Sequence, residues 1–290
     1  MASLPLQIRE ADRVMRRFFV ETSAIQGDKI FITDKQDLHH LRDVLRMKTG
    51  DVLIVSDLSA EAPTRFAGRP HARIPEISDF AESTATEHEA RIERITQTEA
   101  VLSVLSVRAS TREPQTQITL YQGLPKGQKL ELVVQKSIEL GAHRIVPVRT
   151  KRAVPERTDA AAAKKTERLR RIAAETVKQC QRGIVPQVES PISFEEMLRE
   201  FAENQYDLTI ALYELEERRS LKLALKEALP AFPASPSIAV VVGPEGGLEC
   251  AEAEALQSAG AELVTVGRTV LRTETAGPAA IAMIRYELEL

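Results

Sequence analysis

Residues 238–247 read IAVVVGPEGG, five consecutive apolar residues that lead into a glycine-rich loop. An unbroken apolar run of this kind predicts a strand buried on both faces, as in a parallel sheet covered by helices. A helical pattern follows over residues 249–259. Ligands bind to such sheets beyond the carboxyl ends of the strands, so residues 243–247 are the first candidate for a binding loop.

The alternation of strand and helix extends outward from this loop. Strand patterns lie at residues 118–124, 144–148, 208–213, 238–242 and 263–266. Helical patterns lie at residues 129–140, 160–182, 193–201, 221–229, 249–259 and 276–288. We expect Gly141 and Gly183 to end the first two helices, and Ser193 with Glu196 to form a capping box. Residues 118–290 are therefore predicted to form an α/β domain with a parallel sheet.

The first part of the chain has a different pattern, with short strands and one helix. The predicted strands cover residues 29–32, 51–57, 91–96 and 101–107. Leu38, Leu41 and Leu45 mark a helix that Gly50 would end. We predict a small β-barrel or sandwich here. The polar stretch 60–90 is interpreted as a long loop or insertion, and the polar segment 110–117 as the domain boundary.

The composition is that of an ordinary globular protein. Of 290 residues, 43% are hydrophobic and 28% are charged, which excludes wholesale disorder. No window offers the ~18 uncharged apolar residues of a membrane span. The first fourteen residues carry Glu10 and Asp12, so we expect no signal peptide. Cys180 and Cys250 lack the spacing of a disulfide framework or a zinc site, so we expect no metal and a cytoplasmic protein.

Positive charge is concentrated in one segment. The net charge is −3, yet residues 149–182 hold eleven Lys and Arg against four acids. On the helix predicted for residues 160–182, basic side chains recur opposite the apolar face at three- and four-residue spacing. Such a stripe suits a phosphate backbone. A solvated helix face has the same pattern, and the sequence leaves both interpretations open.

The loop GPEGG matches neither GxGxxG nor GxxxxGK[ST], which argues against a dinucleotide-binding loop and a P-loop. The carboxylate of Glu245 would repel a phosphate but tolerate hydroxyl groups or a cation. A plain strand-to-helix turn is the alternative, because proline and glycine are common in turns.

A second candidate loop, residues 266–275 (VGRTVLRTET), follows the last predicted strand and enters the last helix. Thr273 or Thr275 could cap that helix. Arg272 lies close to the helix N-terminus, where a cation opposes the helix dipole, so it is a stronger functional candidate than Arg268. A structural ion pair is the alternative role for Arg272. The adjacent residues His39 and His40 have no third ligand in reach and are not predicted to bind a metal.

These stretches together resemble the SPOUT methyltransferases, and more narrowly the RsmE family of bacterial ribosomal RNA uridine N3-methyltransferases. The resemblance lies in IAVVVGPEGGLECAEAEAL followed by VTVGRTVLRTETAGPAAI. Further similar stretches are GLPKGQKLELVVQKSIELGAHRIVPVRTKRAV, RIAAETVKQCQRGIVPQV, MRRFFV and HHLRDVLRMKTGD. The similarity covers nearly the whole chain, and GPEGG with VLRTET at this separation is specific.

The resemblance implies a fold and an activity. Residues 15–110 would form a PUA-like β-barrel that binds RNA, and residues 118–290 a SPOUT domain with a C-terminal trefoil knot. The enzyme would be a homodimer that uses S-adenosylmethionine to methylate N3 of a uridine in 16S ribosomal RNA of the small subunit. A SPOUT enzyme acting on tRNA and a non-catalytic ribosomal RNA-binding protein are the alternatives. Translation could start at Met15, which would make residues 1–14 an extension.

The resemblance also implies site residues. Cofactor contacts are expected at Leu212, Gly243, Pro244, Glu245, Gly246, Val266 and Leu271. Arg272 would stabilise negative charge on the uracil as an electrostatic clamp. Glu274 is one candidate for the base that removes the N3 proton, which stays unassigned. RNA contacts are expected at Arg16, Arg17, Arg46, Lys164, Arg168, Arg171 and Arg182.

Overall fold

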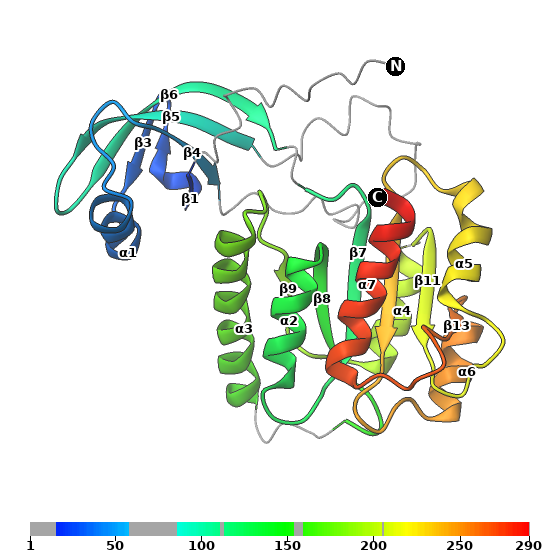
Figure 1. The fold of residues 1–290 in the computed structure, drawn as a ribbon. Helices are drawn as coiled ribbons and strands as arrows, with labels where there is room; N and C mark the ends of the chain where they lie inside the picture. Colours follow the sequence, from blue (N-terminus) through cyan, green and yellow to red (C-terminus); the bar gives the residue numbers. More distant parts are fainter. Residues whose placement is uncertain (1–15, 58–85, 111–112, 154–158, 205, 290) are drawn as a thin grey trace, which may run out of the picture. The chain divides into compact units, whose positions relative to one another are not determined.

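A computed structural model describes residues 16–57, 86–110, 113–153, 159–204 and 206–289 (Figure 1). These residues form two compact units, which meet in the chain near residue 111. Each unit has its own sheet and its own core. Residues 1–14, Met15 and most of the polar stretch 60–90 lie outside the described residues.

The N-terminal unit is a six-stranded mixed sheet with short helical segments. Its strands are β1 (Arg17–Val20), β2 (Ile25–Gln26), β3 (Lys29–Ile32), β4 (Val52–Asp57), β5 (Thr86–Ile95) and β6 (Ala100–Ala109). The order is β1-β4-β5-β6-β3-β2, and in the part of the sheet that the structure describes β1 and β4 pair in parallel while the other pairs are antiparallel. Among the described residues the sheet does not close between β1 and β2. Leu38, Leu41 and Ile92 are fully buried in its core.

Two predictions for this unit need correction. Strand β5 begins at Thr86, inside the stretch interpreted as a loop. Its polar start was missed because Glu87, although charged, is buried against Arg17 and Arg108. The helix α1 (Lys35–His39) continues as a π-helix (His40–Val44), and the chain leaves it at Arg46, whose φ is 53°, ahead of Gly50.

The C-terminal unit is an α/β fold with an all-parallel sheet. Its strands are β7 (Gln117–Gly123), β8 (Ala142–Arg149), β9 (Gln187–Val188), β10 (Ile192–Ser193), β11 (Leu208–Leu212), β12 (Ser237–Val242) and β13 (Glu262–Val264). The main order is β10-β8-β7-β12-β11-β13, and β9 pairs with β8. The central strand β12 is buried along its whole length, which confirms the prediction from IAVVV.

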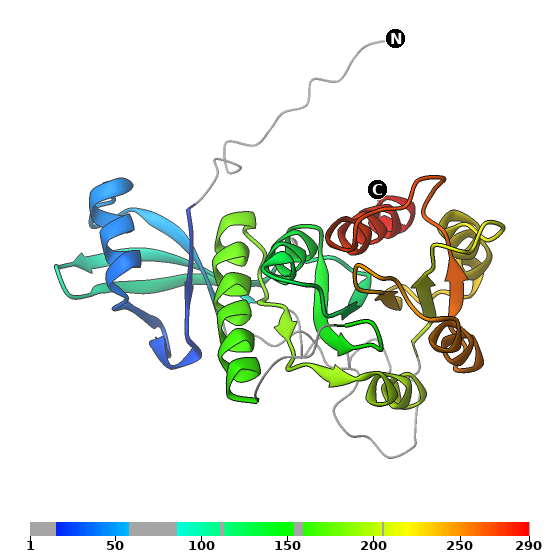
Figure 2. The ribbon, with the colours of Figure 1, turned by 90° about the horizontal axis from the view of Figure 1, so that it is seen from below.

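Helices cover both faces of this sheet (Figure 2). They are α2 (Lys129–Glu139), α3 (Asp159–Cys180), α4 (Phe194–Asn204), α5 (Leu221–Ala228), α6 (Cys250–Ser258) and α7 (Thr273–Glu289). Helices α4 and α6 pack on one face through Met197, Phe201 and Leu256. Helices α2, α5 and α7 lie on the other face, where α7 contacts α2, α5 and β12.

Two of the predictions for residues at the helix ends of this unit are confirmed, and one is wrong. Gly141 follows α2 with a φ of 101°, and Ser193 and Glu196 exchange the two hydrogen bonds of a capping box, so both predictions are confirmed. Helix α3 ends earlier than predicted, at Cys180, and the next residue, Gln181, adopts a φ of 60°. Gly183 is therefore not the residue that ends it.

Candidate functional site

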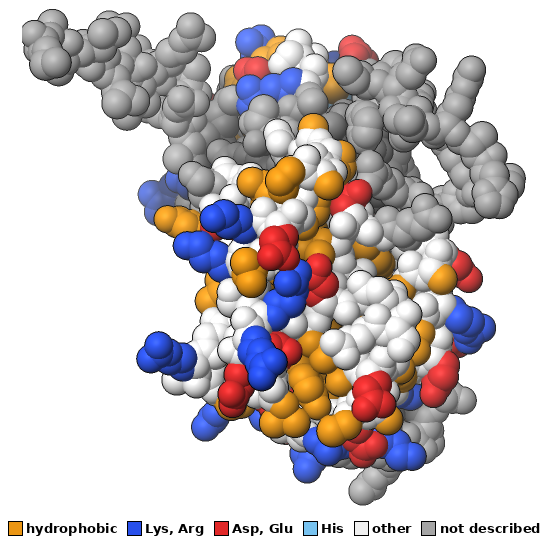
Figure 3. Space-filling view, turned by 90° about the vertical axis from the view of Figure 1, so that its right-hand side faces the viewer, with side chains coloured by type: hydrophobic (Ala, Val, Ile, Leu, Met, Phe, Trp, Pro, Cys, Tyr) orange, Lys and Arg blue, Asp and Glu red, His pale blue; other side chains and the backbone are white. Residues whose placement is uncertain are grey.

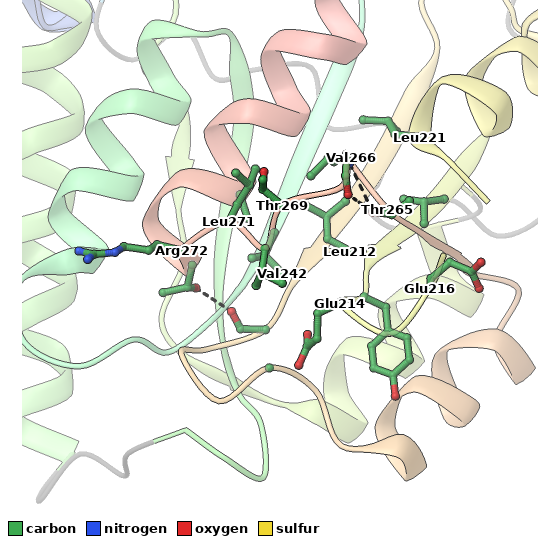
Figure 4. Close-up of a pocket in the computed structure, with 18 of the residues that line it drawn as sticks. Leu212, Glu214, Glu216, Leu221, Val242, Thr265, Val266, Thr269, Leu271 and Arg272 are labelled. Carbon is green, nitrogen blue, oxygen red and sulfur yellow. Dashed lines mark hydrogen bonds between the residues drawn. The ribbon is translucent and has the colours of Figure 1, made fainter. Parts of the chain in front are cut away.

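A cavity of about 1060 Å³ lies beyond the carboxyl ends of β11, β12 and β13 (Figure 4). Most of its lining comes from three segments: residues 212–222 after β11, the loop 243–247 after β12, and residues 264–276 from β13 into α7. Because the three strands are parallel and adjacent, the segments that leave them meet at one edge of the sheet. The cavity therefore forms at the edge where the sequence predicts binding.

The floor of the cavity is apolar. Leu212, Val242, Val264 and Leu271 line it together with Ala276 from α7. Val264 and Val242 are buried, because they belong to strands inside the sheet. In Figure 4 the side chains of Leu212, Val242, Val266 and Leu271 lie close together. A planar, weakly polar group fits such a surface, because its burial removes apolar area from water.

The segment 265–273 is hydrogen-bonded to both neighbouring loops. On one side the Thr265 backbone N–H donates to Arg219 at 2.9 Å and its carbonyl accepts from Leu221 at 2.9 Å. On the other side the Thr273 hydroxyl donates to the Gly243 carbonyl at 2.7 Å and accepts from Gln122 Nε2 at 2.8 Å. Thr273 thus connects two loops and is not the helix cap that the sequence suggested.

Replacement of Thr273 by valine is expected to destabilise the domain by about 1–3 kcal/mol, because it removes the shorter of the two hydrogen bonds to the buried Gly243 carbonyl and one acceptor of Gln122 Nε2. Thr275→Val is the matched control, since Thr275 is exposed in the same turn. Chemical denaturation of both variants measures the difference. Equal stability of the two would contradict a structural role for the Thr273 hydroxyl.

A lysine connects the glycine loop to α7. Lys129 Nζ lies 2.9 Å from Glu245 Oε1 and 3.4 Å from Glu274 Oε2. The backbone N–H of Lys126 also donates to Glu245, at 3.1 Å. Burial acts to raise the pKa of the Glu245 carboxyl, but these donors outweigh it and lower that pKa. Glu245 is therefore charged and already paired, so it does not offer a free carboxylate to a ligand cation.

Arg272 lines the cavity at its rim and is exposed. Among the described residues the structure records neither a hydrogen bond nor an ion pair for its guanidinium, so the alternative of a structural ion pair has no support there. In Figure 4 its side chain points away from Glu214 and Glu216. Arg272 is thus a charged donor at the mouth of a cavity, and no partner for it is recorded within the described part of the chain.

Six of the seven predicted cofactor residues line the cavity: Leu212, Gly243, Pro244, Glu245, Val266 and Leu271. Gly246 is the exception. Its carbonyl accepts from Arg152 Nη1 at 2.5 Å, and a Cβ on Gly246 would point at the Arg152 side chain. Glu214, whose carboxylate packs against Gly247, and Lys129 line the cavity and were not predicted to bind the cofactor.

Two of the predicted RNA-binding residues are buried. Arg182 is 5% exposed and is paired with Glu113 at 2.8 Å. Arg17 has a side chain that is 5% exposed and is paired with Glu87 at 2.7 Å. Both guanidiniums are held inside the fold by carboxylates distant in sequence, so neither can reach a phosphate in this structure.

The other predicted RNA-binding residues are exposed. Lys164, Arg168 and Arg171 lie on the exposed side of α3, while Leu169, Ala173 and Val177 are buried beneath them. Arg168 pairs with Glu131 at 2.8 Å. In the N-terminal unit, Arg16 and Arg46 are exposed. Among the described residues no group of His, Cys, Asp and Glu could hold a metal ion, and no described helix is long and apolar enough to span a membrane.

Comparison with known proteins gives consistent results. The model of a family described as RNA methyltransferase domain matches residues 111–285. The chain is 30% identical to Ribosomal RNA small subunit methyltransferase E of Bacillus subtilis, over 95% of this chain and 98% of the relative. It is 26% identical to the protein of the same name from Mycobacterium bovis, over 92% of this chain and 90% of the relative.

A solved structure is similar over the same length. Ribosomal RNA small subunit methyltransferase E from Neisseria gonorrhoeae, bound to S-adenosylmethionine, superposes with a TM-score of 0.70 at 25% identity. The similarity covers 94% of this chain and 98% of that chain.

Proposed function

The chain belongs to the RNA methyltransferase family, and from this we propose that it transfers a methyl group from S-adenosylmethionine to N3 of a uridine in 16S ribosomal RNA. The observation that carries the proposal is the cavity after β11, β12 and β13, which has an apolar floor and, at its rim, Arg272, for which the described residues offer no recorded partner. Relatives named as small-subunit ribosomal RNA methyltransferases support the same substrate class.

The cavity fits S-adenosylmethionine in size and chemistry. Its volume of about 1060 Å³ accommodates a molecule with a purine, a ribose and an amino-acid tail. The apolar floor at Leu212, Val266 and Leu271 suits the adenine, and backbone groups of these residues and of Gly243 can hold the ring and ribose. When bound, S-adenosylmethionine supplies a methyl group on a positively charged sulfur. The protein has to orient the target base and stabilise its anion.

Arg272 is the residue that we assign to charge stabilisation. Loss of the N3 proton spreads negative charge over both carbonyl oxygens of the uracil. A planar guanidinium offers paired donors to such an anion, and Arg272 has no partner among the described residues that would compete for it. The interaction strengthens as the charge develops, so it acts mainly in the transition state.

Two features of the fold belong to the proposal. The first is a trefoil knot: hydrogen bonds from segment 265–273 to Arg219, Leu221 and Gly243 on its two sides support a chain threaded between two loops. The second is a PUA-like role for the N-terminal unit in RNA binding, which is supported by its mixed six-stranded sheet and exposed Arg16 and Arg46.

We also propose a homodimer. Exposed apolar side chains occur on α7 and at the rim of the cavity: Val270 is 80% exposed, Tyr286 is 71% and Leu215 is 68%. Figure 3 shows apolar side chains exposed among charged ones on one side of the molecule. Apolar area of this kind is typical of surfaces that pack against a partner.

RNA binding by α3 gives a measurable prediction. Lys164→Ala with Arg171→Ala is expected to weaken binding to small-subunit particles and to reduce the salt dependence by about two units of slope. Affinity for S-adenosylmethionine should stay unchanged. The control is Arg199→Ala with Lys226→Ala, two exposed charges on α4 and α5. A wild-type salt slope in the α3 variant would identify the stripe as a solvated helix face.

The substrate class is tested with purified protein and S-adenosylmethionine that carries a labelled methyl group. We expect label in small-subunit particles from cells that lack the gene, and none in particles from cells that carry it. Label in tRNA instead would favour the tRNA enzyme. Tight particle binding without any transfer would favour a non-catalytic RNA-binding protein.

A further inference from the structure

Three charged side chains at the rim of the cavity form a donor–acceptor–donor set: Lys129, Glu274 and Arg272. We propose that this set recognises the N3 edge of the target uracil, and that Glu274 accepts the N3 proton. The inference rests on the proposed function, because it names the residues that would select the base in that reaction.

Lys129 lies where a cation is unfavourable unless it pairs with the carboxylates of Glu245 and Glu274. It is the first residue of α2, where the helix dipole disfavours a cation. Its hydrogen bond to Glu245 raises the pKa of its ammonium, burial acts to lower that pKa, and the nearby Glu274 carboxylate adds to the rise, so Lys129 stays charged. An ammonium has three donors, and Glu245 Oε1, at 2.9 Å, takes one of them. Glu274 Oε2 lies at ion-pair distance, 3.4 Å, but accepts no hydrogen bond among the described residues. Donors of Lys129 therefore remain for a ligand.

The carboxylates of Glu245 and Glu274 differ in how many recorded partners they have. Glu245 is shared between Lys129 and the backbone N–H of Lys126. Glu274 has a side chain that is only 13% exposed, and among the described residues its recorded partner is Lys129 alone. Its Oε2 is buried and accepts no hydrogen bond among the described residues, and Glu274 lines the cavity. Its place in the first turn of α7 also favours a negative charge.

Arg272 immediately precedes α7, two residues before Glu274. Its guanidinium is exposed at the rim and has no recorded partner among the described residues. The cavity lining therefore includes a cation without a recorded partner among the described residues, a carboxylate with an oxygen that accepts no hydrogen bond there, and a second cation with donors left over. All three side chains line the same cavity.

Uracil presents the matching pattern. Its N3–H donor lies between two carbonyl acceptors, O2 and O4. Cytosine has an unprotonated N3 and an amino group, so it would set a lone pair against Glu274 and a donor against a cation. Sites built to hydrogen-bond one pattern reject the other because buried polar groups are left unpaired. The set thus explains a preference for uridine.

The same contacts account for the proton. The N3–H bond breaks and its proton passes to the Glu274 carboxylate. The nitrogen electron pair forms the new N3–methyl bond, while the electron pair of the broken sulfur–methyl bond stays on sulfur. Glu274 then releases the proton to solvent. Lys129 holds the carboxylate in place and, with Arg272, stabilises the charge on the carbonyl oxygens.

The test measures two quantities: the preference for uridine over cytidine in particle binding, and the rate of methyl transfer. Small-subunit particles from cells that lack the enzyme are prepared with either uridine or cytidine at the methylated position. Without S-adenosylmethionine, the wild-type protein should bind the uridine particle about tenfold more tightly. Glu274→Gln keeps the shape but can donate to the cytosine N3, so its preference should fall to within about twofold of unity.

Substitutions of Lys129 provide the second part of the test. Lys129→Met should lose most of the preference for uridine and slow single-turnover transfer about 30-fold, whereas Lys129→Arg should recover part of both. Lys126→Met is the matched control: it removes the same charge three residues away, at an exposed side chain, and should keep the wild-type preference. Thermal melts confirm that each variant is folded.

The outcomes separate this inference from the proposed function. If folded Glu274→Gln and Lys129→Met retain the wild-type preference for uridine, the set does not recognise the base and the inference is wrong. If the wild-type protein transfers no methyl group to the uridine particle, the proposed function fails, and the inference fails with it.

Discussion

Arg272→Ala is expected to slow single-turnover methylation of small-subunit particles by about 100-fold or more, the scale for removal of one preorganised donor. The reason is that the guanidinium meets negative charge that develops on the uracil only as N3 loses its proton. Binding of S-adenosylmethionine should hardly change. Arg272→Lys keeps the charge without the planar pair of donors, so it should recover only part of the loss.

The pH dependence distinguishes this role from a structural one. A rise in pH should partly rescue Arg272→Ala, because solvent base then supplies more of the uracil anion. A residue that only stabilised the fold would instead lower the melting temperature and weaken cofactor binding, with no rescue. Rates across pH, measured beside a thermal melt, decide between them. A mutant that melts early or methylates at the wild-type rate would rule out the clamp.

Gly243→Ala is expected to weaken S-adenosylmethionine binding by about 10- to 100-fold, while Gly246→Ala should change it less than twofold. A Cβ at Gly243 would lie 2.9 Å from the carbonyl carbon of Gly247 and 3.0 Å from the nitrogen of Leu248. Both contacts are backbone, so the whole loop must shift. A Cβ at Gly246 would meet only the Arg152 side chain, at 3.2 Å, which can move aside.

Isothermal titration calorimetry of the two alanine variants measures this contrast directly. The pair is well matched, because both substitutions add one methyl group to the same loop. Equal affinities would contradict the assignment of the loop to the cofactor, provided that both variants melt like the wild-type protein.

Much of the C-terminal fold could be predicted because its signals are local. The apolar run Ile238–Val242 and its neighbours alternate with helical patterns, and the observed sheet is parallel as that alternation requires. The position of the cavity followed from the same reasoning, since parallel strands bring their carboxyl ends to one edge.

The predictions that the structure corrects concern polar residues that pair with a partner distant in sequence. Arg17 and Arg182 look like surface cations in the sequence, but Glu87 and Glu113 hold them inside the fold. Thr273 looks like a helix cap, but its hydroxyl bonds to Gly243, which is thirty positions away. No local pattern in the sequence contains these pairings.

The sequence does contain a signal that marks Lys129 as a functional candidate. A lysine at the first position of a helix opposes the helix dipole, as Arg272 does. The argument that selects Arg272 as a functional candidate therefore applies to Lys129 as well. What the sequence could not provide is the partner set, because Glu245 and Glu274 come close to Lys129 only after β7, β12 and α7 have packed together.

The most direct test of the central claim is the chemical identity of the methylated nucleoside. Purified protein and S-adenosylmethionine are incubated with small-subunit particles from cells that lack the gene, and 16S ribosomal RNA is then digested and analysed by mass spectrometry. We predict the gain of one N3-methyluridine at a single position, with about 100-fold less after the same short time for Arg272→Ala. A methyl group on a ribose, on another base or on no nucleotide at all would contradict the account.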